Sequence, residues 1–493
     1  MVDEKLIVQA GATLADAMKC ISRGEKGFCL ILQENRLIGL MTDGDVRRSI
    51  LEGTKLSDPV DSVMKRDFFS LPVNTSLEIV QKNIDKYKYI PIINNTGELI
   101  DLATASQYHH IPLVKPVFDG NELEYVTDCI KSGWISSQGK YVRQFEEQFG
   151  HYVGCENTLA VSNGTVALHL ALVTLGIGPG DEVIVPNMTF AAPVNAVLYV
   201  GATPVLVDVH PETMALDPEL AAAAITTRTR AIIPVHLYGH PADMERLMNL
   251  AVRYNLLVIE DCAEALGSRY RSIHVGNFGD AATFSFFGNK TITTGEGGML
   301  LFRKSSMRDR AKILRDHGMS PDRRYWHEEV GYNYRLTNIQ AAIGVAQLES
   351  VSLFVERKRW IAEQYNRYLR DIDYLQLPCE QGDVVNSYWL YTVVLLKPLT
   401  PKRNELIDLL TTSGIEARPV FYPLHRMPPY VKFSLAGNTY GVSEQLSDGG
   451  ISLPTSITIS EEDIKTICNI LRSKLDSKNG ESFSKSIPES VID

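Results

Sequence analysis

The alternation of short apolar runs with helical segments from about residue 112 onward limits the possible folds more than any other feature. The apolar runs read DEVIVPNM, TPVLVDV, RAIIPVHL, LLVIEDC, AATFSFF and GGMLLF. Segments such as GTVALHLALVTLGI and DMERLMNLAVRYN lie between them, with helical spacing of their apolar residues. Strands that are apolar on both faces need cover on both sides, so the pattern predicts an α/β fold with a mostly parallel sheet. Ligands of such folds bind at the carboxyl ends of the strands.

The length of the chain, 493 residues, exceeds what one compact core usually holds. We expect a large α/β domain over residues 112–350 and a small C-terminal α/β domain over 351–472, which opens on a long helix. A separate part precedes them over residues 1–108. Residues 473–493 are polar and poor in apolar side chains, so we expect a disordered tail.

Residues 1–108 contain a weak internal repeat. NRLIGLMTDGD aligns with GELIDLATASQ, and the offset between Thr42 and Thr104 is 62 residues (104 − 42). Each copy reads as a helix, an apolar strand, a turn and a second strand, which predicts two hairpins. The pattern resembles a pair of CBS modules, which often bind adenine nucleotides between the two copies.

The CBS resemblance implies a nucleotide-binding role for Thr42 and Asp45, in GLMTDGD. A carboxylate at that spacing can accept hydrogen bonds from both ribose hydroxyls. Gln107 replaces the acid in the second copy, so we expect at most one good site. The alternative is a docking or dimerisation module that binds no ligand.

Bulk properties exclude several classes of protein. The formal net charge is −10 and no run of Lys and Arg is present, so we expect no nucleic-acid partner. The start of the chain is not a signal peptide, and no apolar stretch is long enough to cross a membrane, which favours the cytoplasm. The seven cysteines form no CxxC pair, and His109 and His110 read as linker residues, so we expect no metal site.

A single lysine, Lys290, stands in SFFGNKTITTGEGGM, directly after an apolar strand. It could be a phosphate ligand, a Schiff-base nucleophile or a surface charge. A P-loop needs Gly directly before its Lys, and Asn289 holds that place. Aromatic and small neighbours favour partial desolvation, which favours the neutral, nucleophilic form of an amine. We therefore prefer Schiff-base chemistry.

A Schiff-base lysine that serves pyridoxal phosphate (PLP) needs an acid at the ring nitrogen, an aromatic cover and phosphate donors. Asp261 ends the strand LLVIED, and Phe190 follows another strand in PNMTFAAP. SNGTVALHL is a turn that opens a helix, where free N–H groups favour an anion, and Ser285 could add a hydroxyl donor. Each feature alone also fits a helix cap or a packing residue, but together they favour a PLP site.

Several long motifs carry a family resemblance. They read SGWISSQGKYVRQFEEQF, VSNGTVALHLALVTLGIGPGDEVIVPNMTF, GATPVLVDV, VIEDCAEALGS, SFFGNKTITTGEGGM, GYNYRLTNIQAAIGVAQLE and ISLPTS. Over them the chain resembles the DegT/DnrJ/EryC1/StrS family of PLP-dependent nucleotide-sugar aminotransferases. Within the family, it is most similar to enzymes that make GDP-perosamine and related 4-amino-4,6-dideoxy sugars. The resemblance implies the type I aminotransferase fold, with a large and a small domain.

The resemblance also implies a role for each matching residue. Lys290 would hold PLP, Asp261 would pair with the pyridine nitrogen and Phe190 would stack on the ring. The other implied cofactor contacts are Gly164, Thr165 and Ser285 at the phosphate, Glu264 near the phenolic oxygen, and Asn333 at the phosphate of the partner subunit's cofactor. Glu264 departs from the Gln or His of many members, which leaves its protonation state open. The role of Asn333 implies a homodimer with shared active sites.

The implied reaction moves an amino group from L-glutamate to C4 of a nucleotide-linked 4-keto-6-deoxy sugar, for a surface polysaccharide or glycan. Arg418, His425 and His327 are candidate contacts for the nucleotide sugar; their alternatives are a surface ion pair and structural histidines. The nucleotide stays open between GDP, UDP and dTDP. A rival hypothesis is a nonenzymatic regulator, in which CBS modules are fused to a degenerate aminotransferase fold.

Overall fold

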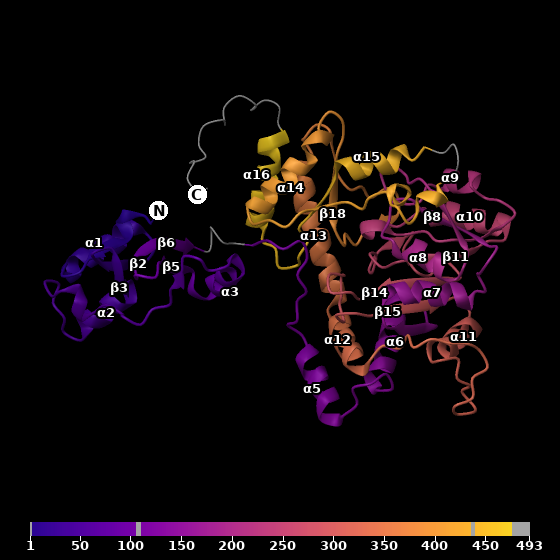
Figure 1. The fold of residues 1–493 in the computed structure, drawn as a ribbon, viewed down its shortest axis with the longest axis horizontal. Helices are drawn as coiled ribbons and strands as arrows, with labels where there is room; N and C mark the ends of the chain where they lie inside the picture. The colour runs from indigo at the N-terminus through magenta and orange to yellow at the C-terminus, as the bar shows by residue number, and fades with distance from the viewer. Residues whose placement is uncertain (1, 105–109, 435–438, 476–493) are drawn as a thin grey trace. The chain divides into compact units, whose positions relative to one another are not determined.

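The computed structural model describes residues 2–104, 110–434 and 439–475. The chain divides into two compact units, Met1–His110 and Ile111–Asp493 (Figure 1). Gln107 and His109 lie outside the described residues, as does 476–493, most of the expected tail. None of the helices in the described ranges is both long and apolar enough to cross a bilayer.

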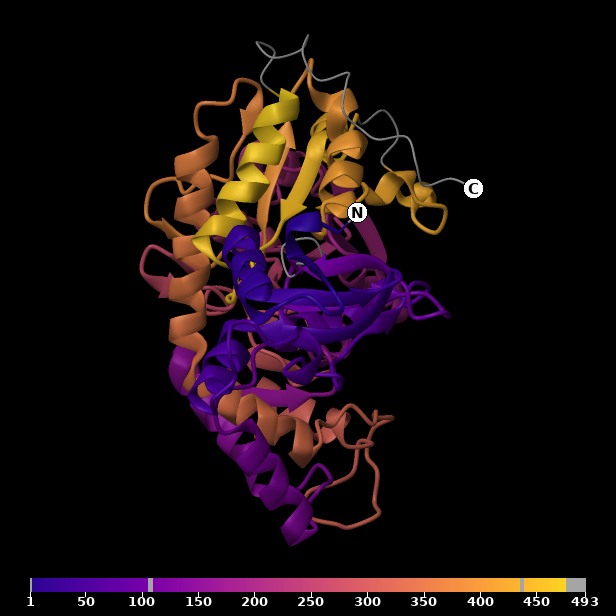
Figure 2. The ribbon, with the colours of Figure 1, turned by 90° about the vertical axis from the view of Figure 1, so that its left-hand side faces the viewer.

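The N-terminal unit is built from two copies of one strand–helix–hairpin motif, visible in indigo and violet in Figure 2. The first copy contains β1 (Ile7–Gln9), α1 (Leu14–Gly24), β2 (Phe28–Gln33), β3 (Arg36–Thr42) and α2 (Asp43–Leu51). The second contains β4 (Leu71–Pro72), α3 (Leu77–Tyr87), β5 (Tyr89–Ile93) and β6 (Leu99–Thr104). Both sheets pair their first two strands parallel and their last two antiparallel.

The two copies also share a detail of strand register. The ladder of β2 and β3 shifts between Ile31 and Leu32, and the ladder of β5 and β6 shifts between Ile92 and Ile93. The copies pack against each other through the rings of Phe28 and Tyr89, whose centroids are 4.9 Å apart. The sequence repeat is therefore a structural repeat: each copy has its own buried cluster, and a further cluster that includes Leu30 and Leu102 joins them.

The second unit contains the expected large sheet, whose strand order is β7-β15-β14-β11-β10-β8-β9. Its strands are β7 (Thr158–Val161), β8 (Glu182–Pro186), β9 (Thr203–Val207), β10 (Thr229–Ile232), β11 (Leu257–Asp261), β14 (Ala281–Ser285) and β15 (Gly298–Phe302). Strand β15 runs opposite to the other six strands. The strands are buried almost throughout, which explains why their sequences are apolar on both faces.

Helices pack on this sheet and on one another (Figure 1). They are α5 (Glu122–Ser132), α6 (Lys140–Val153), α7 (Gly164–Thr174), α8 (Ala192–Tyr199), α9 (Pro218–Ala223), α10 (Met244–Tyr254), α11 (Ser305–Arg315) and α12 (Asn338–Glu349). Helix α7 is apolar around most of its circumference because it packs on β14 and β15 and is covered by α8 and α11. Its first residue, Gly164, lies against Ser285 at the carboxyl end of β14.

The C-terminal region opens on the long helix α13 (Val351–Leu369) and adds an antiparallel sheet of order β16-β18-β20-β19. Its other elements are β16 (Leu375–Gln376), β18 (Tyr391–Leu395), α14 (Arg403–Thr412), β19 (Arg418–Pro419), α15 (Gly441–Gly449), β20 (Gly450–Leu453) and α16 (Glu461–Leu475). The yellow α16 packs beside the orange α13 in Figures 1 and 2. The boundary expected at residue 350 stays a prediction, since residues 111 onward form one compact unit.

Candidate active site

A cavity of about 690 Å³ lies at the carboxyl ends of β11 and β14. Asp261 is the last residue of β11 and Ser285 is the last residue of β14, and both line the cavity. The other predicted site residues in its wall are Gly164, Thr165, Phe190, Glu264, Lys290 and Arg418. The strand ends meet here because β11 and β14 are parallel neighbours.

The amine of Lys290 has two close neighbours in this cavity. Its Nζ lies 3.3 Å from Oε1 of Glu264 and 3.8 Å from the ring centroid of Trp389. The other oxygen of Glu264 accepts a hydrogen bond from the Tyr238 N–H at 2.9 Å. Burial raises the pKa of Glu264, and the nearby Lys290 charge and the Tyr238 N–H oppose that rise. The amine of Lys290, the predicted Schiff-base nucleophile, thus contacts a carboxylate and the face of an aromatic ring.

Asp261 is a buried carboxyl group with few compensating donors. Its Oδ1 accepts the N–H of Ala263 at 3.0 Å. Burial raises the pKa of Asp261 to about 6, although the Ala263 N–H and the charge of Lys290 act in the opposite direction. A cationic ring nitrogen beside this carboxylate would offset the cost of its burial, so Asp261 fits the role of partner to a protonated pyridine.

The first turn of α7 provides donors for a phosphate. Asn163 caps the helix by accepting the Val166 N–H at 3.0 Å. The N–H groups of Gly164 and Thr165 come earlier than any intrahelical bond can reach, and no acceptor for them lies in the described part of the chain. Ser285 closes the same corner, since a Cβ at Gly164 would lie 3.0 Å from the Ser285 Cβ.

This donor set fits PLP. Two backbone N–H groups at a helix start, with the Thr165 and Ser285 hydroxyls, suit a phosphate. An amine and a carboxylate line the same cavity, as an aldehyde-bearing pyridinium requires. Phe190 supplies an exposed ring in the cavity wall, with its centroid 6.0 Å from that of Phe421.

Three predicted residues lie outside the cavity wall. His327 is exposed, and its Nδ1 lies 2.8 Å from the carbonyl oxygen of His317. Asn333 is exposed in an isolated bridge with Asp316. The ring nitrogens of His425 contact Asn187 at 2.9 Å and Glu444 at 3.2 Å, so both are engaged within the protein.

Arg418 does line the cavity, and its guanidinium group is paired with Glu416. The side chain is about half exposed, so it can turn toward a ligand without losing a buried contact. Of the three candidate contacts for the nucleotide sugar, Arg418 lines the cavity, whereas His327 and His425 do not.

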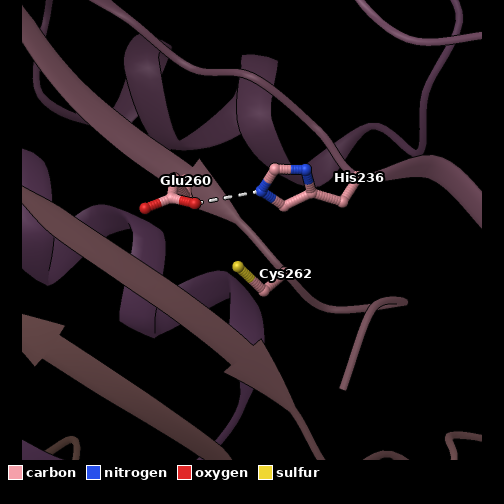
Figure 3. A group of neighbouring side chains, drawn as sticks. All are labelled: His236, Glu260 and Cys262. Carbon is pink, nitrogen blue, oxygen red and sulfur yellow. Dashed lines mark hydrogen bonds and ion pairs between the residues drawn. The ribbon is translucent and has the colours of Figure 1, made fainter. Parts of the chain in front are cut away.

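A buried cluster beside the site consists of His236, Glu260 and Cys262 (Figure 3). The carboxylate of Glu260 accepts the N–H groups of Gly276, Phe278 and Gly279 at 2.8 Å each, and His236 Nε2 lies 3.2 Å away. The other ring nitrogen of His236 accepts the Ala242 N–H at 3.0 Å. The potential metal-binding atoms of Glu260 and His236 are therefore occupied by hydrogen bonds that anchor the end of β11.

In the N-terminal unit, Thr42 and Asp45 form a capping box at the start of α2. Thr42 Oγ1 lies 2.7 Å from Asp45 Oδ2, and Lys65 and Arg48 pair with the other carboxylate oxygen. Burial disfavours the ionised form, but the hydrogen bonds from Thr42, Lys65 and Arg48 outweigh it and hold the pKa of Asp45 below its usual value. Asp45, the residue predicted to bind a ribose, thus already pairs with several protein groups.

Trp389 and Tyr238 also line the cavity, and no sequence motif predicted them there. Trp389 stands in SYWLYTVVLL, where its position just before a buried strand was the available signal. Tyr238 stands in a helical turn with a left-handed backbone, φ 54°, directly before Gly239, which was the local sequence signal for a turn.

The model of the DegT/DnrJ/EryC1/StrS aminotransferase family matches residues 116–472. The chain belongs to this family. The match begins after the N-terminal unit, so residues 1–115 precede the aminotransferase. The enzyme is a PLP-dependent aminotransferase, as the motifs predicted.

Relatives and solved structures agree with this assignment. The aminotransferase is 48% identical to the GDP-perosamine synthase of Escherichia coli O157:H7, over 73% of this chain and 97% of that protein. It is 47% identical to the GDP-perosamine synthase of Caulobacter vibrioides, again over 73% and 97%. DesV of S. venezuelae, solved in complex with a ketimine intermediate, matches with a TM-score of 0.68 and 35% identity over 72% of this chain and 94% of that one.

Proposed function

We propose that this aminotransferase moves the amino group of L-glutamate to C4 of a GDP-linked 4-keto-6-deoxy sugar, as a GDP-perosamine synthase does. The observation that carries the proposal is the convergence of Lys290, Asp261 and the first turn of α7 on one cavity. The named function of relatives that are 43–48% identical over nearly their whole length supports the substrate class.

The residues of the chain divide the work as follows. When bound, PLP supplies an electron sink that makes the α-proton of the amino donor acidic. Lys290 holds the cofactor aldehyde and, once released, moves a proton between cofactor and substrate carbon. Asp261 keeps the ring nitrogen charged, because an ionised carboxylate in a buried site favours a cation beside it. Gly164, Thr165 and Ser285 hold the phosphate.

Glu264 is placed to govern the charge of Lys290. Its burial favours the protonated carboxyl, and its 3.3 Å contact with Nζ favours the carboxylate. Because these two effects oppose each other, Glu264 can hold a proton while the amine is neutral and return it when the amine leaves the cofactor. We propose that Glu264 also lies near the phenolic oxygen of PLP, where it could exchange a proton in the same way.

Recognition of the sugar nucleotide involves Arg418, whose guanidinium can bind a diphosphate bidentately. His327 and His425 stay candidates for movement on binding or for contacts from a second subunit. We propose a homodimer in which Asn333, exposed in one chain, reaches the phosphate of the partner's cofactor. We further propose that the enzyme acts in the cytoplasm, in a pathway for a surface polysaccharide or glycan.

The N-terminal unit is proposed to be a CBS pair with at most one adenine-nucleotide site, at Thr42 and Asp45. Its repeated topology supports the assignment. A titration of the full chain with ATP, AMP and adenosine, followed by calorimetry, tests it. Heat of binding that vanishes in Asp45→Ala supports a site there, whereas no heat with any of the three leaves the unit as a docking or dimerisation module.

A glutamate-dependent assay tests the main proposal. The full chain with PLP is given GDP-, UDP- and dTDP-linked 4-keto-6-deoxy sugars, and the amino sugar and 2-oxoglutarate are measured. We expect turnover with the GDP sugar to exceed the other two. Turnover mainly with UDP or dTDP would correct the nucleotide, and no turnover with any sugar would contradict the substrate class.

Borohydride reduction separates an enzyme from a degenerate scaffold. The full chain incubated with PLP should acquire a stable adduct on the peptide that contains Lys290, and Lys290→Met should acquire none there. A wild-type chain that stays unlabelled would favour the regulator hypothesis.

A further inference from the structure

We infer that the ring of Trp389 is a platform on which the amine of Lys290 lies whenever it is not bonded to the cofactor. The buried Lys358 is a positioning residue that holds Trp389 in place. The inference deepens the proposed function, on which it rests, because that reaction needs the amine of Lys290 both bonded to the cofactor and free to carry a proton. A lysine side chain has four rotatable carbon–carbon bonds, so the free amine needs a defined resting place.

The contacts of Trp389 define such a place. Lys290 Nζ lies 3.8 Å from the centroid of the Trp389 ring, within reach of a cation–π interaction. The indole N–H donates to the carbonyl oxygen of Asn289 at 2.7 Å, so the same ring also holds the backbone next to Lys290. Glu264 receives the amine from another direction at 3.3 Å. The ring and the carboxylate together give the amine two anchors.

Trp389 is itself held within a row of aromatic rings. Its ring is nearly parallel to that of Tyr238, with centroids 6.3 Å apart and planes 12° apart. Tyr238 is likewise parallel to Phe421, at 5.7 Å and 8°. All three line the cavity, and the Tyr238 N–H holds Glu264. The two anchors of the amine are therefore parts of one packed wall.

Lys358, on α13, lies behind Trp389. Its Nζ donates to the carbonyl oxygens of Trp389 and Thr455, both at 3.1 Å, and the Thr455 hydroxyl donates to the Trp389 carbonyl at 2.9 Å. Trp389 and Thr455 extend the register of β18 and β20, in which Tyr391 lies opposite Leu453. Lys358 therefore joins the ends of two neighbouring strands at the residue that carries the platform.

The environment of Lys358 argues against a mere packing role. The side chain is buried, and no carboxylate of the described residues pairs with it. A buried ammonium group without an opposite charge is costly, and an apolar side chain of similar length would fill the space at less cost. What an apolar side chain could not do is donate to two carbonyl groups at once.

The test measures the reactivity of Lys290 without any substrate. The full chain freed of PLP is treated with formaldehyde and cyanoborohydride, and methylation of the peptide that contains Lys290 is followed by mass spectrometry. A cation–π contact is worth about 0.5–2 kcal/mol, which converts to about a 2- to 30-fold change in rate. We expect Trp389→Leu to label faster by that factor and Trp389→Phe, which keeps an aromatic face, to fall between it and the wild type.

Lys358→Met should also raise the labelling rate, by about 2-fold or more. Without the hydrogen bond from Lys358, the backbone of Trp389 can shift and its ring no longer stays fixed beside Lys290. Arg357→Met is the matched control, since Arg357 directly precedes Lys358 on α13 and donates to the carbonyl oxygens of Ile457 and Ile459 instead. It should label at the wild-type rate. With PLP and substrates, Trp389→Leu and Lys358→Met should lower kcat and leave the KM for the keto sugar nearly unchanged.

Two results would overturn the inference: wild-type labelling in Trp389→Leu, or a rise in Arg357→Met equal to that in Lys358→Met. Circular dichroism of each variant separates these results from misfolding, and Trp389→Phe keeps the test valid if the leucine variant does not fold. A wild-type enzyme that aminates no sugar nucleotide would contradict the proposed function alone, because the labelling series does not depend on a substrate.

Discussion

Gly164 and Ser285 come so close that a Cβ on Gly164 would lie 3.0 Å from the Cβ of Ser285. One residue begins α7 and the other ends β14, so this approach is what brings the first turn of the helix and a strand-end hydroxyl to one corner of the cavity. The approach is tighter than ordinary side-chain packing, and it brings candidate phosphate donors from two distant segments to one corner of the cavity.

Gly164→Ala should therefore weaken cofactor binding. The added methyl group has to push Ser285 or the helix start aside, and crowding of this kind costs about 1–3 kcal/mol, or about a 5- to 150-fold loss in PLP affinity. Fluorescence titration of the full chain with PLP measures it. Gly441→Ala is the control, since Gly441 also begins a helix and has nothing within 4 Å of the added Cβ. Equal losses in both variants would contradict the explanation.

Asp261→Asn should change how stability depends on pH. Burial raises the pKa of Asp261 to about 6 in the folded chain, against 3.8 for an ordinary aspartate. The folded state therefore binds this proton more tightly, and cofactor-free wild-type protein loses up to roughly 3 kcal/mol as pH rises from about 4 to about 6. The asparagine variant lacks that loss.

Thermal unfolding without PLP, at pH 4 to 8, tests the sign. The stability of the variant relative to the wild type should increase as pH rises through this window. The variant should also bind PLP more weakly, because the ring nitrogen loses its anionic partner. A variant less stable than the wild type at pH 7 by the same amount as at pH 4 would contradict the assignment of that pKa to Asp261.

Lys358→Met should alter stability in a different pH window. Burial lowers the pKa of Lys358 to about 7, against 10.5 in an ordinary lysine. Below pH 7 both states hold the proton and the folded state bears the full cost; between about 7 and 10.5 only the unfolded state holds it, so wild-type stability rises with pH, by roughly 5 kcal/mol at most. Unfolding at pH 6, 8 and 10 should show a flatter profile in the variant, whereas Arg357→Met should keep the wild-type slope.

Asp45→Asn should destabilise the N-terminal unit at neutral pH. The carboxylate caps α2 and pairs with Lys65 and Arg48, so its pKa is lowered and its contribution is present above about pH 4 and lost as pH falls further. A lost cap costs about 1 kcal/mol. Hydrogen exchange of α2 amides measures the change, and Asp43→Asn is the control because the carboxylate of Asp43 pairs with the exposed Arg47. Equal exchange in the two variants would contradict the role of the cap.

The sheet and much of the candidate PLP site could be predicted from the sequence for a physical reason. A buried parallel strand must be apolar on both faces, and parallel strands place their carboxyl ends at one edge, so Asp261, Ser285 and Lys290 had to approach one another once the fold class was known. The internal repeat of the N-terminal unit was readable for a similar reason, since equal hairpins need equal patterns of apolar residues.

The amino-acid sequence by itself determined the alternating strands and helices, the residues at the strand ends and the family to which the chain belongs. Only the tertiary structure decided that Trp389 faces Lys290, that Lys358 supports Trp389 and that His425 is engaged by Asn187 and Glu444. Those contacts join residues 19 to 238 positions apart. They depend on how side chains pack across elements, and local periodicity contains no record of that packing.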